Sequence, residues 1–143
     1  MEFRIVDHYS KDYWKLVRLR DKILREPLNL MFSEEELFLE NEQIHIGSFE
    51  NETAVASLSF VKLSDSLLKM RQVCVSKELQ GKNIGKELID YSEKWAIENS
   101  FKDIECNARE SAVPFYKANN YSIIGEQFFE IRIPHFKMVK SLF

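Results

Sequence analysis

The sequence predicts an α+β protein built on a mixed, mostly antiparallel β-sheet. Three β-rich runs, at Gln43–Phe49, Ala54–Leu63 and Leu67–Val75, are separated by short polar connections that are typical of an antiparallel meander. An amphipathic helix then separates the third run from a strand at Lys102–Ala108, and a crossover of this kind implies a parallel strand pair. A length of 143 residues suits one domain, so we expect residues 1–143 to form a single domain.

The segment before the meander is predicted to hold one strand and two helices. Phe3–His8 has the composition of a short strand, and Ser10 can cap the helix that follows it. The apolar residues of that helix recur at helical spacing, and they are Leu16, Leu19 and Ile23. We expect this helix to stop before Pro27. Ser33–Asn41 begins with a cap residue and three acidic residues, which suit the positive end of a second helix.

The segment after the meander is predicted to alternate helices and strands. The strongest helical pattern runs from Ile84 to about Asn99, where apolar residues recur along one face at Ile84, Leu88, Tyr91 and Trp95. Ser111–Asn120 predicts a short helix that tolerates Pro114 in its first turn. Terminal strands are expected at Tyr121–Gly125 and Glu130–Lys140. These elements amount to about seven strands and about four helices.

Composition and charge exclude several classes of function. Hydrophobic residues make up 45% of the chain and charged residues 30%, as in ordinary globular proteins. The formal net charge is -3 and there is no long run of Lys or Arg, so we expect neither nucleic acid nor an anionic membrane as a partner. No apolar run approaches the roughly 20 residues that span a bilayer, and no signal peptide precedes the first strand. We therefore expect a cytoplasmic location.

The two cysteines are expected to be buried free thiols. Cys74 and Cys106 are isolated in apolar, strand-like stretches. Their spacing fits neither a zinc site nor a disulfide framework, and a free Cys behaves as a small hydrophobic residue. We therefore expect no metal site.

The segment Gln80–Gly85 places two of the four glycines of the chain at a strand-to-helix junction. The first amides of a helix have no intrahelical acceptor and lie at the positive end of its dipole, so an anion is expected there. Gly81 and Gly85 permit close approach to the backbone, and Asn83 tolerates a left-handed conformation. The cations beside the loop are Lys82 and Lys86. The spacing fits neither a P-loop nor a dinucleotide-binding motif, and a plain turn with a helix cap is the alternative.

Four ordered motifs resemble those of a known family. The stretch QGKNIG is similar to the Q/R-x-x-G-x-G/A pyrophosphate loop of the general-control-type N-acetyltransferase (GNAT) superfamily, and AVPFYKANNY resembles its A-x-x-F-Y-x-x-x-G-F/Y helix. LRDKILREPL and IPHFKMVK resemble the entry helix and the tail of the small bacterial ElaA/YjcF-like branch. Asn83 and Asn120 stand where the superfamily usually has Gly, which is a mild change because Asn also adopts left-handed conformations.

The resemblance implies a GNAT-like sheet whose two central strands splay apart, with acetyl-CoA as the cofactor. Its pyrophosphate would bind the backbone of Gln80, Gly81, Lys82, Asn83, Ile84, Gly85 and Lys86. Its pantetheine arm would run beside the main chain of Val73, Cys74 and Val75. Arg109 stands where many relatives carry a cofactor-binding Asn, and pairing with a phosphate or with an acidic neighbour is the alternative.

The resemblance also implies roles in proton transfer. Tyr116 matches the tyrosine that protonates the leaving CoA thiolate, and a phenol with a reference pKa of about 10 stays protonated at neutral pH. An aromatic pair with Phe115 in the core is the alternative. The attacking amine must lose a proton, because an ammonium has no lone pair. The candidate bases are His135, Glu130, Glu126 and His45, of which the first two lie in or beside the tail motif.

The acceptor is expected between the first helices and the terminal strands, near Arg20, Arg25 and Pro27. Two arginines there favour a substrate with a carboxylate or phosphate as well as an amine, and solvated helix charges are the alternative. The implied activity is direct acetyl transfer, in a ternary complex, to the amine of a small molecule or peptide. The other hypotheses are a CoA-binding sensor or partner-binding module, and covalent transfer through Cys74 or Cys106. The resemblance leaves a homodimer open.

Overall fold

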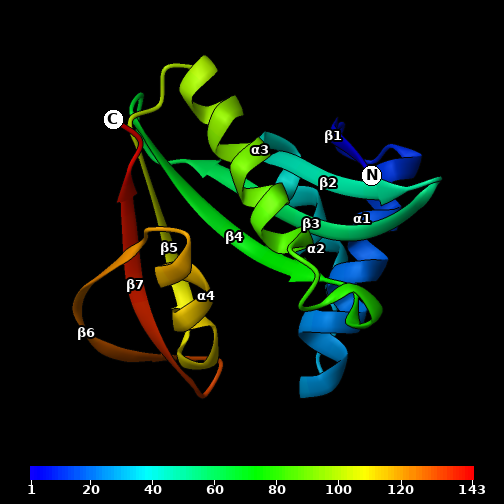
Figure 1. The fold of residues 1–143 in the computed structure, drawn as a ribbon. Coiled ribbons are helices and arrows are strands. Elements are labelled where there is room, and N and C mark those ends of the chain that lie inside the picture. Colours follow the sequence, from blue (N-terminus) through cyan, green and yellow to red (C-terminus); the bar gives the residue numbers. More distant parts are fainter.

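The computed structural model describes residues 1–143 as a seven-stranded sheet flanked by four α-helices (Figure 1). The strands are β1 (Glu2–Val6), β2 (Ile44–Glu50), β3 (Thr53–Lys62), β4 (Leu67–Val75), β5 (Asp103–Arg109), β6 (Ser122–Glu130) and β7 (Ile133–Ser141). The α-helices are α1 (Lys11–Arg20), α2 (Glu34–Phe38), α3 (Ile84–Glu98) and α4 (Val113–Ala118). Short π or 3₁₀ turns are η1 (Asp21–Arg25), η2 (Glu26–Leu28), η3 (Leu39–Glu42), η4 (Lys77–Leu79) and η5 (Glu110–Ala112). No helix has the length and hydrophobicity needed to cross a membrane.

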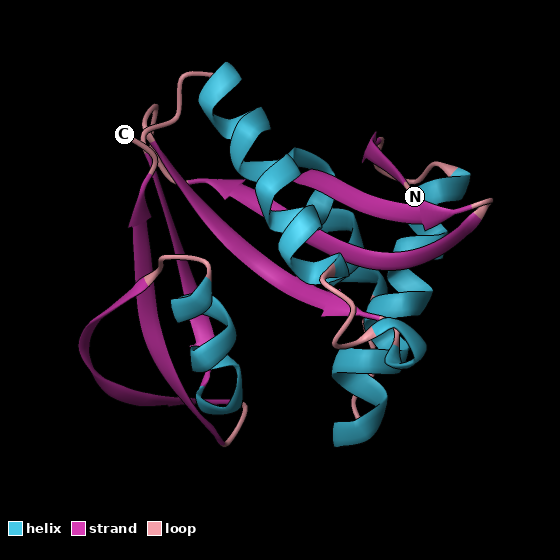
Figure 2. Cartoon of the chain, viewed as in Figure 1, coloured by secondary structure: helices cyan, strands magenta, loops and turns pink.

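The sheet confirms the predicted mixed topology. Its strand order is β1-β2-β3-β4-β5-β7-β6, and the only parallel pair is β4 with β5. Helix α3 connects these two strands across one face, as the strand–helix–strand pattern predicts. Figure 2 shows α3 and α4 in front of the sheet, with α1 and α2 behind it. The structure thus has one hydrophobic core on each side of the sheet.

The central strands β4 and β5 separate halfway along their length. Their parallel register ends at the pair Met70 and Cys106, so the segments Arg71–Val75 and Asn107–Arg109 have no strand partner on the facing edges. A register shift against β3 accompanies a positive φ of 56° at Gln72, which marks a β-bulge in β4. Figure 2 shows the two strands diverging. The predicted splayed pair is confirmed.

Local capping rules account for the N-terminal helices. The Ser10 hydroxyl accepts a hydrogen bond from the Tyr13 N–H at 3.1 Å, and Ser33 forms a capping box with Glu36. The first helix differs from its prediction, because α1 ends at Arg20 and helical turns continue through η1 and η2. Pro27 lies in the first turn of η2, where its missing N–H costs no helical hydrogen bond.

The C-terminal hairpin differs from the two strands predicted there. Strand β6 runs on to Glu130, and β7 begins at Ile133 after a two-residue turn. Ile131 and Arg132 have φ angles of 51° and 61°, a conformation that hairpins usually reach with Asn or Gly. Gly125, with φ 77°, lies at a register shift inside β6 instead of ending the strand. The prediction failed because the turn residues carry no turn signal.

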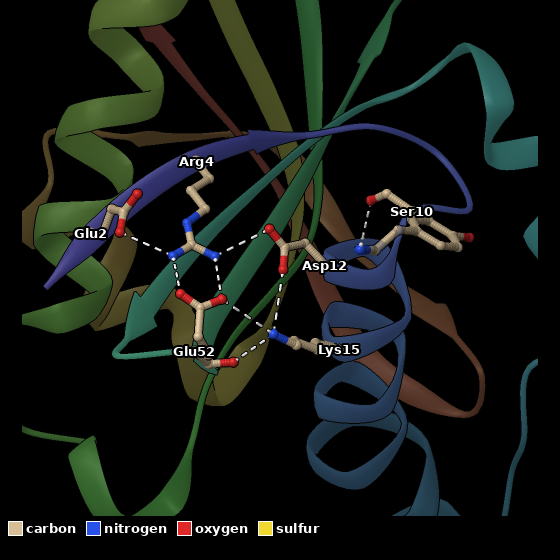
Figure 3. A network of polar contacts seen from close by, with 7 residues as sticks. Glu2, Arg4, Ser10, Asp12, Lys15 and Glu52 are labelled. Atoms are coloured by element: carbon tan, nitrogen blue, oxygen red, sulfur yellow. Dashed lines mark hydrogen bonds and ion pairs between the residues drawn. The ribbon is translucent and has the colours of Figure 1, made fainter.

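A surface network of charges joins β1, α1 and the turn between β2 and β3 (Figure 3). The Arg4 guanidinium lies between the carboxylates of Glu2, Asp12 and Glu52, at 3.0, 3.1 and 3.1 Å. The Lys15 ammonium donates to the Glu52 carbonyl at 2.8 Å. Segments that are distant in sequence are therefore held together at this edge of the sheet.

A buried ion pair joins α1 to η3. Two nitrogens of Arg20 donate to the two carboxylate oxygens of Glu40 at 3.2 and 2.9 Å, and the Tyr13 hydroxyl donates to Glu40 at 2.7 Å. His45 bonds the Glu40 carbonyl through Nε2 and the Ser59 hydroxyl through Nδ1, and its burial lowers its pKa. These polar groups satisfy one another except for Arg20 Nε, which is buried without a partner, and the cluster fixes the position of α1 over the sheet.

Candidate active site

A cleft of about 400 Å³ opens where β4 and β5 diverge. Its walls come from the segment after α1, from β4, from β5, from α4 and from the β6–β7 hairpin. The predicted site residues among those that line it are Arg25, Val73, Arg109, Tyr116, Glu130 and His135. Residues from both ends and the middle of the chain therefore meet at the splayed strands.

The loop before α3 carries a row of unpaired backbone donors. Gly81 and Asn83 have φ angles of 81° and 65°, and Asn83 makes no side-chain cap. The N–H groups without an acceptor in the chain are those of Gly81, Asn83, Ile84, Gly85 and Lys86. The N–H groups of Gln80 and Lys82 donate instead to the Lys77 and Leu79 carbonyls. Five donors at the positive end of a helix of 15 residues form an environment suited to an anion.

The side chains around this loop have different roles. Gln80 donates from Nε2 to the Val75 carbonyl at 3.0 Å, which ties the loop to the end of β4. Lys86 pairs with Asp90 at 2.8 Å, whereas Lys82 has no ion-pair partner. A Cβ on Gly85 would lie 3.2 Å from the Phe115 ring, so this glycine permits close packing of α3 on α4. Gly81 has open space around it and meets the need for positive φ.

The end of β4 has one free edge. Cys74 and Val75 pair with Ser57 and Ala56 of β3, while no strand lies along the other edge. Main-chain groups of Val73–Val75 can therefore bind an extended, amide-containing molecule as a further strand would.

Tyr116 projects from α4 into the cleft and is 8% exposed. Its ring packs edge-on against Phe115 and Tyr121, with centroid distances of 5.2 and 5.8 Å. Burial raises the pKa of the Tyr116 hydroxyl well above its usual range, and the nearby Cys106 and Cys74 act in the same direction. The phenol is thus neutral at physiological pH and can donate a proton.

His135 and Glu130 supply two groups that can accept a proton. His135 Nδ1 lies 2.7 Å from the Ile133 carbonyl, which only accepts, so Nδ1 carries a hydrogen, and in the neutral imidazole the lone pair lies on Nε2. The ring stacks on Phe128 with a centroid distance of 5.8 Å. Glu130 accepts a hydrogen bond from Asn107 Nδ2 at 3.3 Å. Asn107 was not predicted as a site residue, although it is a polar residue between the buried Cys106 and Ala108 on β5.

Two arginines connect the first helical segment to the cleft. Arg109 donates to the Leu24 carbonyl at 3.3 Å, so it bridges β5 and η1 and has no acidic partner. Arg25 pairs with Glu36 at 2.9 Å and lies over the Phe32 ring at 4.1 Å. Both side chains shape the wall formed by the first helical segment.

Four residues predicted near the site do not line the cleft, and they are Arg20, Pro27, His45 and Glu126. Arg20 and His45 belong to the buried cluster around Glu40, which explains their polarity without a ligand. Pro27 is exposed in η2, and Glu126 is exposed on β6.

Comparisons with known proteins agree with this geometry. A model of the acetyltransferase (GNAT) domain matches residues 26–142. YjcF of Bacillus subtilis, described as an uncharacterized N-acetyltransferase, is 30% identical over 124 residues, which cover 86% of this chain and 88% of YjcF.

Solved structures share the whole fold. Escherichia coli ElaA is 19% identical and superposes with a TM-score of 0.81, covering 97% of this chain and 98% of ElaA. An aminoglycoside 6'-N-acetyltransferase complexed with coenzyme A is 14% identical, with a TM-score of 0.81 over 100% of this chain and 98% of the other. The domain match and the relationship to YjcF show that the chain belongs to the GNAT acetyltransferase family.

Proposed function

We propose that this protein transfers an acetyl group from acetyl-CoA to a primary amine by direct attack in a ternary complex. The observation that carries the proposal is the set of five unpaired N–H groups between Gly81 and Lys86, in the loop that follows the free edge of β4. A diphosphate suits these donors, and the amides of a pantetheine arm suit the main chain of Val73–Val75. Acetyl-CoA supplies the acetyl group activated as a thioester. The family relationship and the CoA complex of a protein with this fold support the assignment.

Two proton transfers would accompany the reaction. The amine nitrogen forms a bond to the acetyl carbon and loses a proton to His135 Nε2 or to the Glu130 carboxylate. The carbon–sulfur bond breaks, and the Tyr116 hydroxyl gives its proton to the sulfur. The raised pKa of Tyr116 keeps the phenol protonated before the reaction, although it also makes the phenol a weaker acid toward the sulfur.

A thermal-shift assay and a CoA-release assay test this function together. Acetyl-CoA at about 100 times its Kd should stabilise the protein by about 2.7 kcal/mol, and an amine screen should release free CoA. Gly81→Ala should weaken acetyl-CoA binding roughly tenfold, because strain at a positive φ displaces the loop donors. Gly125→Ala is the matched control, since Gly125 also has a positive φ of 77° and open surroundings but lies in β6.

The possible results separate the competing functions. No thermal shift with acetyl-CoA, or an equal loss of binding in both glycine variants, would contradict the proposed cofactor site. A thermal shift without CoA release for any amine would instead favour a CoA-binding sensor.

Covalent transfer through a cysteine is not expected. Cys74 and Cys106 are buried free thiols, and burial raises the pKa of each to about 12, so neither forms an appreciable thiolate at neutral pH. Mass spectrometry after incubation with acetyl-CoA alone should find both thiols unmodified. A cysteine peptide that gains one acetyl group would show that transfer is covalent.

A further inference from the structure

The cleft has an unusual charge for this protein. The chain carries a formal net charge of -3, yet the residues that line the cleft include four cations and one carboxylate. The cations are Arg25, Lys69, Arg71 and Arg109, and the carboxylate is Glu130. A concave site lined mainly by one sign of charge attracts a ligand of the opposite sign.

Two of these cations have no partner within the protein. Arg25 pairs with Glu36, and Arg109 donates to a backbone carbonyl. The side chains of Lys69 and Arg71 form no hydrogen bond or ion pair within the protein, although both residues are half-buried. Glu105 lies beside Lys69 in the register of β4 with β5, but its carboxylate pairs with Lys137 at 3.3 Å.

The geometry of β4 places these two cations side by side. Residues two apart on a strand point to the same face, roughly 6.6 Å apart, and Met70 between them points into the core. They lie where the paired part of β4 and β5 ends, because the register stops at Met70 and Cys106. An Arg and a Lys at this spacing can both bind the same carboxylate or phosphate.

The proposed cofactor does not use these cations. Its diphosphate is assigned to the loop beyond Val75, and Arg71 precedes Val75 by four residues, or roughly 13 Å of strand. The pantetheine arm carries no charge. Glu130 and His135, the candidate proton acceptors, line the same cleft from the β6–β7 hairpin, which β5 separates from β4 in the sheet. The cleft thus has a cationic wall on β4 and a proton-accepting wall on the β6–β7 hairpin.

We infer that the acceptor is a small molecule that carries a carboxylate or phosphate in addition to its amine. Lys69 and Arg71 bind the anionic group, which directs the amine toward Glu130 and His135. A volume of about 400 Å³ suits a small molecule. The inference rests on the proposed acetyl transfer and adds the chemical class of its acceptor.

Matched amine pairs test the inference through kcat/KM for CoA release. The pairs are γ-aminobutyrate with butylamine, and phosphoethanolamine with ethanolamine. The anionic member of each pair should be preferred by about tenfold to a hundredfold, the range expected for hydrogen bonds between charged groups. Lys69→Gln combined with Arg71→Gln should abolish the preference by lowering kcat/KM for the anionic member of each pair.

Lys62→Gln is the matched control, because Lys62 is a cation of the neighbouring strand that pairs with Asp65 outside the cleft. It should keep the preference. The thermal shift with acetyl-CoA should be unchanged in all variants, which shows that they are folded. Three results would overturn the inference but leave the proposed acetyl transfer intact. They are equal turnover within each pair, a preference that survives the double substitution, and faster acetylation of a lysine peptide. Release of no CoA with any amine would overturn both.

Discussion

Tyr116→Phe is expected to lower kcat by about 10²- to 10⁴-fold, the range that a positioned general acid contributes. The change removes the only proton donor that the structure places on α4 at the splayed strands, where the leaving sulfur is proposed to lie. The aromatic ring keeps its packing against Phe115 and Tyr121, so the fold should be retained. Steady-state CoA release measures kcat, and the thermal shift with acetyl-CoA measures binding.

Tyr91→Phe provides the control for this substitution. Tyr91 lies on α3 and stacks on Phe3 with a centroid distance of 5.1 Å, outside the cleft. This variant should keep full activity. If Tyr116→Phe also turns over at the wild-type rate, the proton reaches the sulfur from another donor, and the role proposed for Tyr116 is wrong.

Glu40→Ala is expected to reduce the free energy of unfolding by about 3–5 kcal/mol, the usual effect of removing one partner of a buried ion pair. The change leaves the Arg20 guanidinium, which is 1% exposed, without its counter-charge. It also removes the acceptor of the Tyr13 hydroxyl. Urea unfolding monitored by the fluorescence of the tryptophans measures the loss.

Two further variants show whether burial of the charges causes the loss of stability. Arg20→Met combined with Glu40→Leu removes both charges and should recover much of the lost stability, because apolar residues can replace a buried pair. Asp65→Asn breaks the exposed pair with Lys62 and should leave the unfolding curve almost unchanged. A loss below about 1 kcal/mol for Glu40→Ala would mean that water solvates the orphaned guanidinium.

Local sequence rules predicted most of the fold. Ser10 and Ser33 cap helices as their sequences indicate, and the crossover through α3 produces the parallel pair of β4 and β5. Helix periodicity and strand alternation are properties of neighbouring residues, so they can be read from one sequence. The turn at Ile131–Arg132 could not be predicted in this way, because its conformation is imposed by the pairing of β6 with β7.

The candidate site was harder to predict, because its partners are distant in the chain. Arg20 was expected near the acceptor, yet it pairs with Glu40, twenty residues away. Lys69 and Arg71 alternate with apolar residues on β4, a pattern that is equally typical of a strand with one solvated face. Only the splay of β4 from β5 shows that this face lines a cleft.

The central claim is that the backbone donors at the start of α3 hold the diphosphate of the cofactor. A titration of nitrogen-labelled protein with CoA, followed by amide NMR, tests it most directly. The largest changes are expected at Gly81, Asn83, Ile84, Gly85 and Lys86, and pantetheine, which lacks the diphosphate, should leave these amides almost unmoved. Unchanged loop resonances in the presence of saturating CoA, with shifts confined to other parts of the chain, would contradict the claim.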